Sequence, residues 1–204
     1  MTAREDVLRR IRGANIAAGD IDPPQVPRDY HRSGTHPAGS AAVLELLTDR
    51  LLDYRAAVIE AADGAVQEAI RTALAGVTGP VLVPPGLPDG WWPDGIVDAG
   101  FSPTELDGYA AVVTGCAAAC AVTGTIALDG SPDQGRRAIT LVPDMHVCVV
   151  RAEQVVHAVP ELLARLDPVR PTTFVSGPSA TSDIELERVE GVHGPRTLIV
   201  VLVA

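Results

Sequence analysis

The polar residues best suited to chemistry are concentrated near the end of the sequence, between two apolar runs. Residues 176–185 read Ser-Gly-Pro-Ser-Ala-Thr-Ser-Asp-Ile-Glu, a segment crowded with hydroxyls and carboxylates. Ser182 and Glu185 have the spacing of a capping box, and free N–H groups at such a helix start would suit an anionic group of a ligand. The same hydroxyls could instead serve only to cap a turn. The candidate ligand-binding residues of this loop are Ser176, Gly177, Ser179 and Thr181.

A second candidate is Thr123-Gly124-Thr125, where a glycine interrupts an apolar run. A structural bulge accounts for a glycine in this position. The functional alternative is a close approach of the backbone to a ligand, with both threonine hydroxyls available for hydrogen bonds. The sequence leaves the two readings open.

The third candidate is the turn formed by Gln134, Gly135, Arg136 and Arg137, which carries two guanidinium groups in an acidic protein. Arginine binds carboxylates and phosphates through two parallel hydrogen bonds, so this turn predicts an acidic small molecule as ligand. A solvated charged turn is an equally good interpretation.

Four residues are candidates for acid–base catalysis: His146, Asp183, Glu185 and His193. Imidazole titrates near neutrality, and two neighbouring carboxylates can share acid and base roles. A lone histidine more often satisfies a local hydrogen bond, however, and the two carboxylates also fit a capping role. The sequence contains no nucleophile elbow, P-loop or dinucleotide-binding glycine motif, so these residues by themselves name no reaction.

Composition limits the classes of partner. The formal net charge is −10 and the sequence pI is about 4.8, so a phosphate backbone or an anionic membrane surface would repel the chain. No apolar stretch approaches the ~20 residues of a membrane span. The N-terminus lacks the apolar core of a signal peptide, and we therefore expect a cytoplasmic protein that binds no nucleic acid.

The cysteines and histidines indicate neither a metal site nor a bound cofactor. Cys116, Cys120 and Cys148 lie within apolar runs, and their number is odd. Their spacing is not that of a zinc or iron–sulfur motif, and the five histidines show no paired spacing. We expect reduced thiols in a hydrophobic core.

Short apolar strands that alternate with helices predict an α/β fold, with a parallel-rich sheet covered by helices on both faces. Residues 1–39 are expected to form an amphipathic helix over 4–17, followed by a proline-rich arm. Residues 40–204 are expected to form one α/β domain. Its expected early strands are 56–59, 81–83, 96–97 and 110–113, and its expected early helices are 40–53, begun by Ser40 with Leu52 inward, and 65–74.

After Gly115 the pattern changes to three close apolar runs that predict a β-meander attached to the sheet. A helix over 153–166 follows, in which Pro160 marks a kink or a second start. The final strand–loop–strand then completes the sheet. Ligands of open α/β sheets bind at the carboxyl ends of strands, so Arg136 and Ser179 are expected to face each other across one cleft there. The runs of the meander are 120–128, 138–142 and 147–150.

The segment 176–185, followed by Gly-Val-His-Gly-Pro-Arg at 191–196, resembles the C-terminal signature of the lactate-utilization protein C family, the LUD-domain proteins. The resemblance implies the fold shared by CoA transferases and ribose-phosphate isomerases. It also implies a place in bacterial lactate oxidation beside partner proteins that carry iron–sulfur clusters. At Val122 the family has a glutamate, and any chemistry that depends on that carboxylate is in doubt in this chain.

Two functions follow from these observations. The first is an accessory subunit of an iron–sulfur lactate oxidation system, which binds a small acidic ligand or partner proteins. The alternative is an isomerase or CoA-transferase-like enzyme that acts on a small phosphorylated or acyl substrate, with Arg136, His146, Asp183 and the 176–179 loop in its site. A homo-oligomer is compatible with either function.

Overall fold

The computed structural model describes residues 2–19, 25–181, 189–190 and 194–204. Contacts divide the chain into two compact units, Met1–Tyr30 and His31–Ala204. In the described part of the chain, no helix is long and apolar enough to span a membrane.

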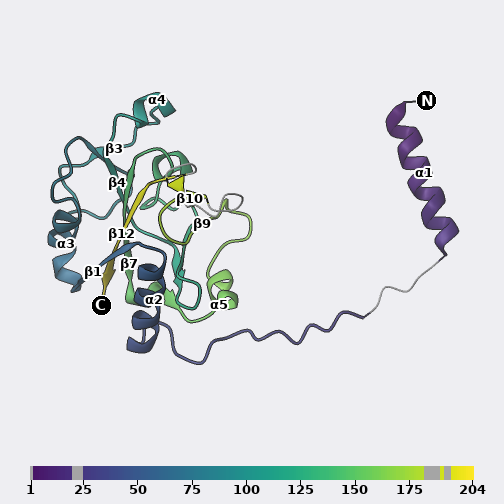
Figure 1. The fold of residues 1–204 in the computed structure, drawn as a ribbon, viewed down its shortest axis with the longest axis horizontal. Helices are drawn as coiled ribbons and strands as arrows, with labels where there is room; N and C mark the ends of the chain where they lie inside the picture. Colours follow the sequence, from purple (N-terminus) through teal and green to yellow (C-terminus); the bar gives the residue numbers. More distant parts are fainter. Residues whose placement is uncertain (1, 20–24, 182–188, 191–193) are drawn as a thin grey trace. The chain divides into compact units, whose positions relative to one another are not determined.

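The first unit carries helix α1 (Ala3–Ala18), so the helix expected over 4–17 is confirmed (Figure 1). It begins at a capping box in which Thr2 and Glu5 satisfy each other's backbone N–H groups. Its apolar side chains are not buried within the unit, and Val7 and Ile11 are 55% and 51% exposed.

The second unit is built on a six-stranded sheet in which every neighbouring pair is parallel. The two longest strands lie next to each other near its centre, and their β-branched residues are almost continuously buried, as expected of a sheet covered on both faces. This arrangement confirms the predicted α/β class. In spatial order the strands are β1 (Ala57–Ala61), β12 (Thr197–Val203), β7 (Met145–Arg151), β4 (Ala111–Thr114), β2 (Val81–Val83) and β3 (Ile96–Val97).

Alternation along β7 assigns its side chains to two cores. Val147 and Val149 pack with Ile70 of helix α3 (Val66–Ala73) on one face. Cys148 and Val150 pack on the other face, in the same core as helix α2 (Ala41–Asp53), whose buried stripe is Val43, Leu47 and Leu51. With this i, i+4 spacing, the residue that follows Leu51 lies outside the buried face of the helix.

Two details of α2 therefore differ from expectation. Leu52, predicted to point inward, is 55% exposed. Ser40 occupies the N-cap position as expected, but its side chain makes no capping hydrogen bond, and its hydroxyl is buried without a hydrogen-bond partner among the described residues.

A second, four-stranded sheet lies over the α2 side of the parallel sheet. Strand β6 pairs antiparallel with β5 and with β9, and β8 pairs parallel with β5. Ala119, Ile126 and Val155 of this sheet share the core of α2, and Leu162 of helix α5 packs against the opposite face. The elements are β5 (Ala118–Cys120), β6 (Thr125–Leu128), β8 (Val155–Val156), β9 (Thr173–Val175) and α5 (Val159–Ala164).

The antiparallel strands are thus β5, β6 and β9, and none of the three predicted meander runs is placed as expected. The run over 120–128 is divided by a turn at 121–124 into the end of β5 and strand β6. Residues 138–142 were expected to be a strand, but Arg137–Thr140 forms the 3-10 helix η2, closed by a hydrogen bond from Thr140 Oγ1 to the Arg137 carbonyl. Residues 147–150 belong to β7 of the parallel sheet. A short apolar run is too short to show the periodicity that distinguishes a strand from a helical turn.

The helix expected over 153–166 is also wrong in its first half. Residues 152–154 form the 3-10 helix η3 (Ala152–Gln154), and Val155 and Val156 pair with Ala119 and Cys120 as strand β8. The α-helix begins only at Val159, with Pro160 in its first turn, where a missing N–H costs nothing. Pro160 therefore marks a start and not a kink.

The final strand–loop–strand, expected to complete a single sheet, instead connects the two sheets. Strand β9 belongs to the second sheet, whereas β12 lies inside the parallel sheet. Between them, β10 (Ala180–Thr181) pairs antiparallel with β11 (Val189–Glu190). The remaining short helices are η1 (Asp63–Ala65) and α4 (Pro103–Leu106).

The arm before α2 is held against the α/β unit from residue 34 onward. The backbone N–H groups of Thr35 and His36 both donate to His157 Nδ1 at 3.0 Å, and the His36 and His157 rings stack. The Gly39 N–H donates to the Val155 carbonyl. A separate LUD-like domain beginning at residue 40 remains a prediction.

Candidate functional site

A cavity of about 720 Å³ opens beside the carboxyl ends of β2 and β3. Its walls come from the residues that follow those strands, from the turn that precedes η2, and from the loop that leads into β9. Loops of this kind meet where parallel strands end, which is the usual position of a ligand site in an open α/β sheet. Three arginines line it: Arg136, Arg137 and Arg170.

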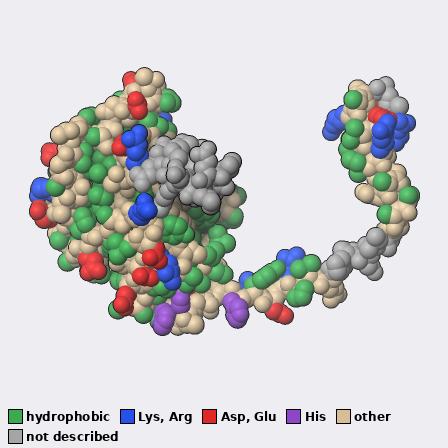
Figure 2. All heavy atoms as spheres, in the orientation of Figure 1, with side chains coloured by type: hydrophobic (Ala, Val, Ile, Leu, Met, Phe, Trp, Pro, Cys, Tyr) green, Lys and Arg blue, Asp and Glu red, His purple; other side chains and the backbone are tan. Residues whose placement is uncertain are grey.

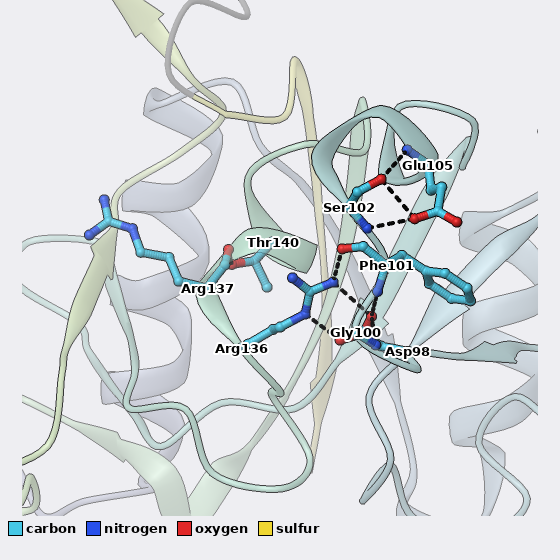
Figure 3. Close-up of polar contacts among 8 residues, drawn as sticks. All are labelled: Asp98, Gly100, Phe101, Ser102, Glu105, Arg136, Arg137 and Thr140. Carbon is cyan, nitrogen blue, oxygen red and sulfur yellow. Dashed lines mark hydrogen bonds and ion pairs between the residues drawn. The ribbon is translucent and has the colours of Figure 1, made fainter.

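Arg136 is engaged by a carboxylate. Its Nε donates to Asp98 Oδ2 at 2.6 Å and its Nη2 to Oδ1 at 2.9 Å, and Nη2 also donates to the Phe101 carbonyl at 2.6 Å (Figure 3). The Asp98 side chain is only 6% exposed. The hydrogen bond from Arg136 lowers the pKa of Asp98 in spite of its burial, and Asp98 in turn raises the pKa of Arg136. Arg136 therefore fixes the wall of the cavity and is not free to hold an anion.

Arg170 is also paired. Its Nη1 lies 3.1 Å from Asp129 Oδ2 and donates to Ser131 Oγ at the same distance. Asp129 is largely buried at the end of β6, and its backbone N–H donates to Gln134 Oε1. Two of the three guanidinium groups of the cavity thus have their charge balanced by the protein.

Arg137 differs from its neighbours. It extends away from Arg136 and Asp98, on the far side of Thr140 (Figure 3). Among the described residues no carboxylate lies within salt-bridge distance of it, whereas Arg136 and Arg170 each have one. All 16 basic residues of the chain are arginines, and on the face shown in Figure 2 acidic and basic side chains are interspersed. Arg137 is accordingly the cation of this cavity that is available to an anion.

A second, smaller cavity of about 240 Å³ adjoins the first, and Thr140 and Thr173 line both. It lies beside the amino ends of β7 and β12, where His146 and Leu198 are register partners. This position contrasts with the carboxyl-end location expected for the whole site. Its remaining described lining residues are Leu141, Phe174, Val175, Ser176, Gly177, Pro178, Ser179 and Pro195.

The predicted site residues are divided between the two cavities. The turn with Gly135, Arg136 and Arg137 lines the first, and the loop with Ser176, Gly177 and Ser179 lines the second. Arg136 and Ser179 therefore do not face each other across one cleft; they line adjoining cavities that share a wall.

Thr123, Gly124 and Thr125 line neither cavity. Thr123 and Gly124 lie in the turn between β5 and β6, and Thr125 is the first residue of β6. Gly124 has a φ of 59°, and an added Cβ would lie 2.8 Å from Cβ of Arg50. The Thr123 hydroxyl is buried without a hydrogen-bond partner among the described residues. The Thr125 hydroxyl lies 2.8 Å from Ser176 Oγ, so Thr125 contacts a residue that lines the second cavity.

Of the predicted acid–base residues, His146 lies at the second cavity and is 2% exposed. Its Nε2 is 2.8 Å from Thr114 Oγ1, and that hydroxyl donates to the Gly115 carbonyl at 2.8 Å. Asp183, Glu185 and His193 lie outside the described residues, as does the Ser182 half of the expected capping box. For Thr181 the structure describes only a backbone position in β10.

The cysteines are buried and reduced, as the sequence predicts. Cys148 Sγ donates to the Gly115 carbonyl, and Cys116 Sγ donates to Gln154 Oε1, both at 3.6 Å. The hydrogen bond with Cys148 and burial raise the pKa of Cys116. Within the described ranges, no group of three or more His, Cys, Asp or Glu side chains is arranged to hold a metal ion.

Sequence reasoning missed four residues that shape the site: Asp98, Thr114, Asp129 and Arg170. Three of them share a signal, because Asp98, Thr114 and Asp129 each stand at or just after the end of an apolar strand. Polar residues at strand ends are where an α/β sheet presents side chains to a ligand. Arg170 follows a proline-flanked loop and carries no such signal.

Comparison with known proteins places this arrangement in a family. The LUD domain matches residues 104–203, a region that contains η2, β7, β12 and most of both cavity linings. A lactate utilization protein C from Deinococcus radiodurans is 47% identical over 175 residues, which cover 82% of each protein. A lactate utilization protein C from Bacillus subtilis is 30% identical over 95 residues, which cover 41% of this chain and 38% of that protein.

A solved structure agrees with these sequence matches. The crystal structure of a DUF162 family protein from Deinococcus radiodurans superposes with a TM-score of 0.68 at 40% identity, covering 80% of this chain and 98% of that one. The signature residues, the parallel sheet and these similarities lead to one assignment: the chain belongs to the LUD-domain family of lactate utilization protein C.

Proposed function

We propose that this protein acts in lactate utilization as an accessory subunit that binds a small organic anion in the first cavity. We call it the arginine cavity because Arg136, Arg137 and Arg170 line it. The observation that carries the proposal is Arg137, a guanidinium without a carboxylate partner among the described residues, in a cavity whose other arginines are paired. An unpaired guanidinium in a concave site attracts a carboxylate with both charge and a planar pair of donors.

The names of the relatives supply the biological setting. Proteins called lactate utilization protein C match this chain over as much as 82% of its length, and lactate is itself a small carboxylate. The net charge of −10 disfavours the binding of anions to the chain as a whole, so a site for one requires a cation that the protein does not neutralise. Arg137 is such a cation among the described residues of this cavity.

The electron-transfer step of lactate oxidation is assigned in this proposal to partner proteins with iron–sulfur clusters, as the family resemblance implies. The described cysteines support this division of labour, because all three are packed in the core. Cys116 and Cys148 lie in the α2 core and Cys120 in the core beneath α5. None of them is presented to a cavity.

The position at which the family has a glutamate supports an accessory role over isomerase or CoA-transferase chemistry. Val122 is 47% exposed on the turn between β5 and β6, and it lines neither cavity. An aliphatic side chain supplies neither a nucleophile nor a base there.

Complementation tests the proposal. In a strain that lacks this gene, the wild-type chain and Arg12→Gln should restore growth on lactate, and Arg137→Gln should not. Arg12 lies on α1 in the separate N-terminal unit, so its variant controls for the loss of one positive charge. Full growth with Arg137→Gln would overturn the anion site. Oxidation of lactate by the purified protein alone, with an added electron acceptor, would overturn the accessory role.

A further inference from the structure

The polar centre of the second cavity is His146, whose ring is almost completely buried at the amino end of β7. Its Nε2 lies 2.8 Å from Thr114 Oγ1, on the neighbouring strand β4. Contact with a hydroxyl does not by itself say which partner donates, because both groups can do so. The hydrogen bonds around Thr114 decide it.

Thr114 has one hydroxyl proton, and that proton is directed to the Gly115 carbonyl at 2.8 Å. A carbonyl oxygen can only accept. Thr114 Oγ1 must therefore accept from His146, which places the ring proton on Nε2. In its neutral form the ring then carries an unprotonated Nδ1 with a lone pair. Cys148 is consistent with this pattern, because its thiol donates to the same Gly115 carbonyl.

The contact with Thr114 engages Nε2 of His146 and leaves Nδ1 out, the Cys148 side chain also interacts with the ring, and the ring lines a cavity of about 240 Å³. Nδ1 is not among the fully buried side-chain atoms that lack a partner, and a cavity of this size can hold a small molecule that would pair with it. The described lining carries no Asp, Glu or Arg side chain. A neutral His146 ring with Nδ1 unprotonated is complemented by an uncharged donor such as a hydroxyl.

We infer that the second cavity binds the hydroxyl group of a small ligand, which donates to Nδ1 of His146, and that Thr114 is the positioning residue that fixes the proton of the neutral ring on Nε2. The hydroxyl can belong to a neutral alcohol or to a hydroxy acid. Both sources use the same hydrogen bond, and they differ in whether a carboxylate accompanies it. The inference does not depend on Arg137, which lines only the first cavity.

Nitrogen-15 spectroscopy of the histidine side chains in the full chain tests the inference, with His146→Phe used to assign the resonances. The expected tautomer has its proton on Nε2. Propane-1,2-diol or L-lactate should shift the Nδ1 resonance upfield, and propionate, which lacks the hydroxyl, should not. A response to both hydroxylated probes indicates an alcohol site, and a response to lactate alone indicates a hydroxy-acid site.

Three results would overturn the inference: a proton on Nδ1, equal shifts with lactate and propionate, or no shift with either hydroxylated probe. Probes at about 100 mM would saturate a site with a Kd of about 1 mM. Thr114→Val should abolish the tautomer preference and Thr114→Ser should restore it, an effect that a purely structural role would not produce. Arg137→Gln should leave the response to propane-1,2-diol intact, so failure of the anion site and failure of this site are separable.

Discussion

The Arg136 guanidinium is clamped on the Asp98 carboxylate by two parallel hydrogen bonds of 2.6 and 2.9 Å, across 38 residues of sequence. The pair joins the loop after β3 to the turn before η2 and forms one wall of the arginine cavity. It holds this wall in place and leaves Arg137 as the arginine that can receive a ligand.

The first prediction concerns this clamp. Asp98→Asn should lower the free energy of unfolding by about 1–2 kcal/mol, because Arg136 loses a charged acceptor that is nearly buried. Chemical denaturation measures the change. The matched control is Glu68→Gln, which breaks an exposed pair with Arg71 on α3 and should cost less than about 0.5 kcal/mol. Equal losses for the two variants would show that the Asp98 pair contributes nothing beyond a surface contact.

The second prediction follows from the lowered pKa of Asp98. Its pKa in the folded protein lies below that of an unfolded aspartate, about 3.9, so the ion pair stabilises the fold fully above that value. The contribution is lost as pH falls through the lower, folded pKa. The stability difference between wild type and Asp98→Asn should therefore be constant from pH 7 to about pH 5 and shrink below about pH 4. A difference that persists at pH 2 would contradict an electrostatic origin.

Replacing Asp133 should change the stability at neutral pH in the opposite direction to replacing Asp98. Its carboxylate packs against Gly115, and burial raises its pKa. A raised acid pKa means that the charged form opposes folding, so the penalty is present above the folded pKa and absent below the unfolded one. Asp133→Asn should raise the Tm at pH 7, corresponding to about 0.5 kcal/mol, with no gain below about pH 4. A lower Tm at pH 7 would show that the hydrogen bonds of the carboxylate outweigh its burial.

The contact between the arm and His157 provides a fourth prediction. A Cβ at Gly34 would lie 2.5 Å from Cβ of His157, so Gly34→Ala should displace the arm. The amides of Thr35 and His36, which donate to His157 Nδ1, should then exchange with solvent at least tenfold faster. Gly13→Ala is the control, because nothing lies within 4 Å of its Cβ position. Unchanged exchange at Thr35 and His36 in Gly34→Ala would contradict this contact.

Much of the fold was predictable because its strands are short, apolar and bounded by turn residues. Strand β2, for example, ends at Pro84-Pro85, and α2 shows a clear i, i+4 stripe. The errors fall where tertiary contacts override a local pattern. Val155 and Val156 fit a helix by periodicity, but pairing with Ala119 and Cys120 holds them in a strand.

The candidate site was predictable only in its parts. The turn with Gly135, Arg136 and Arg137 lines one cavity, and the loop with Ser176, Gly177 and Ser179 lines another. Their role in ligand binding remains a prediction. Their division between two cavities depends on η2 and Thr140, and residues 138–142 read as a strand in the sequence. The role of Arg136 depends on a partner 38 residues away, which no local spacing reveals. The availability of Arg137 is likewise a property of the folded arrangement.

The most direct test of the central claim is calorimetric titration of L-lactate into the wild-type chain, Arg137→Gln and Arg12→Gln. The anion site predicts binding to wild type and Arg12→Gln, and affinity at least tenfold weaker for Arg137→Gln, since a charge-assisted pair contributes more than about 1.4 kcal/mol. Equal affinity of wild type and Arg137→Gln for lactate, or no binding to wild type, would contradict the account.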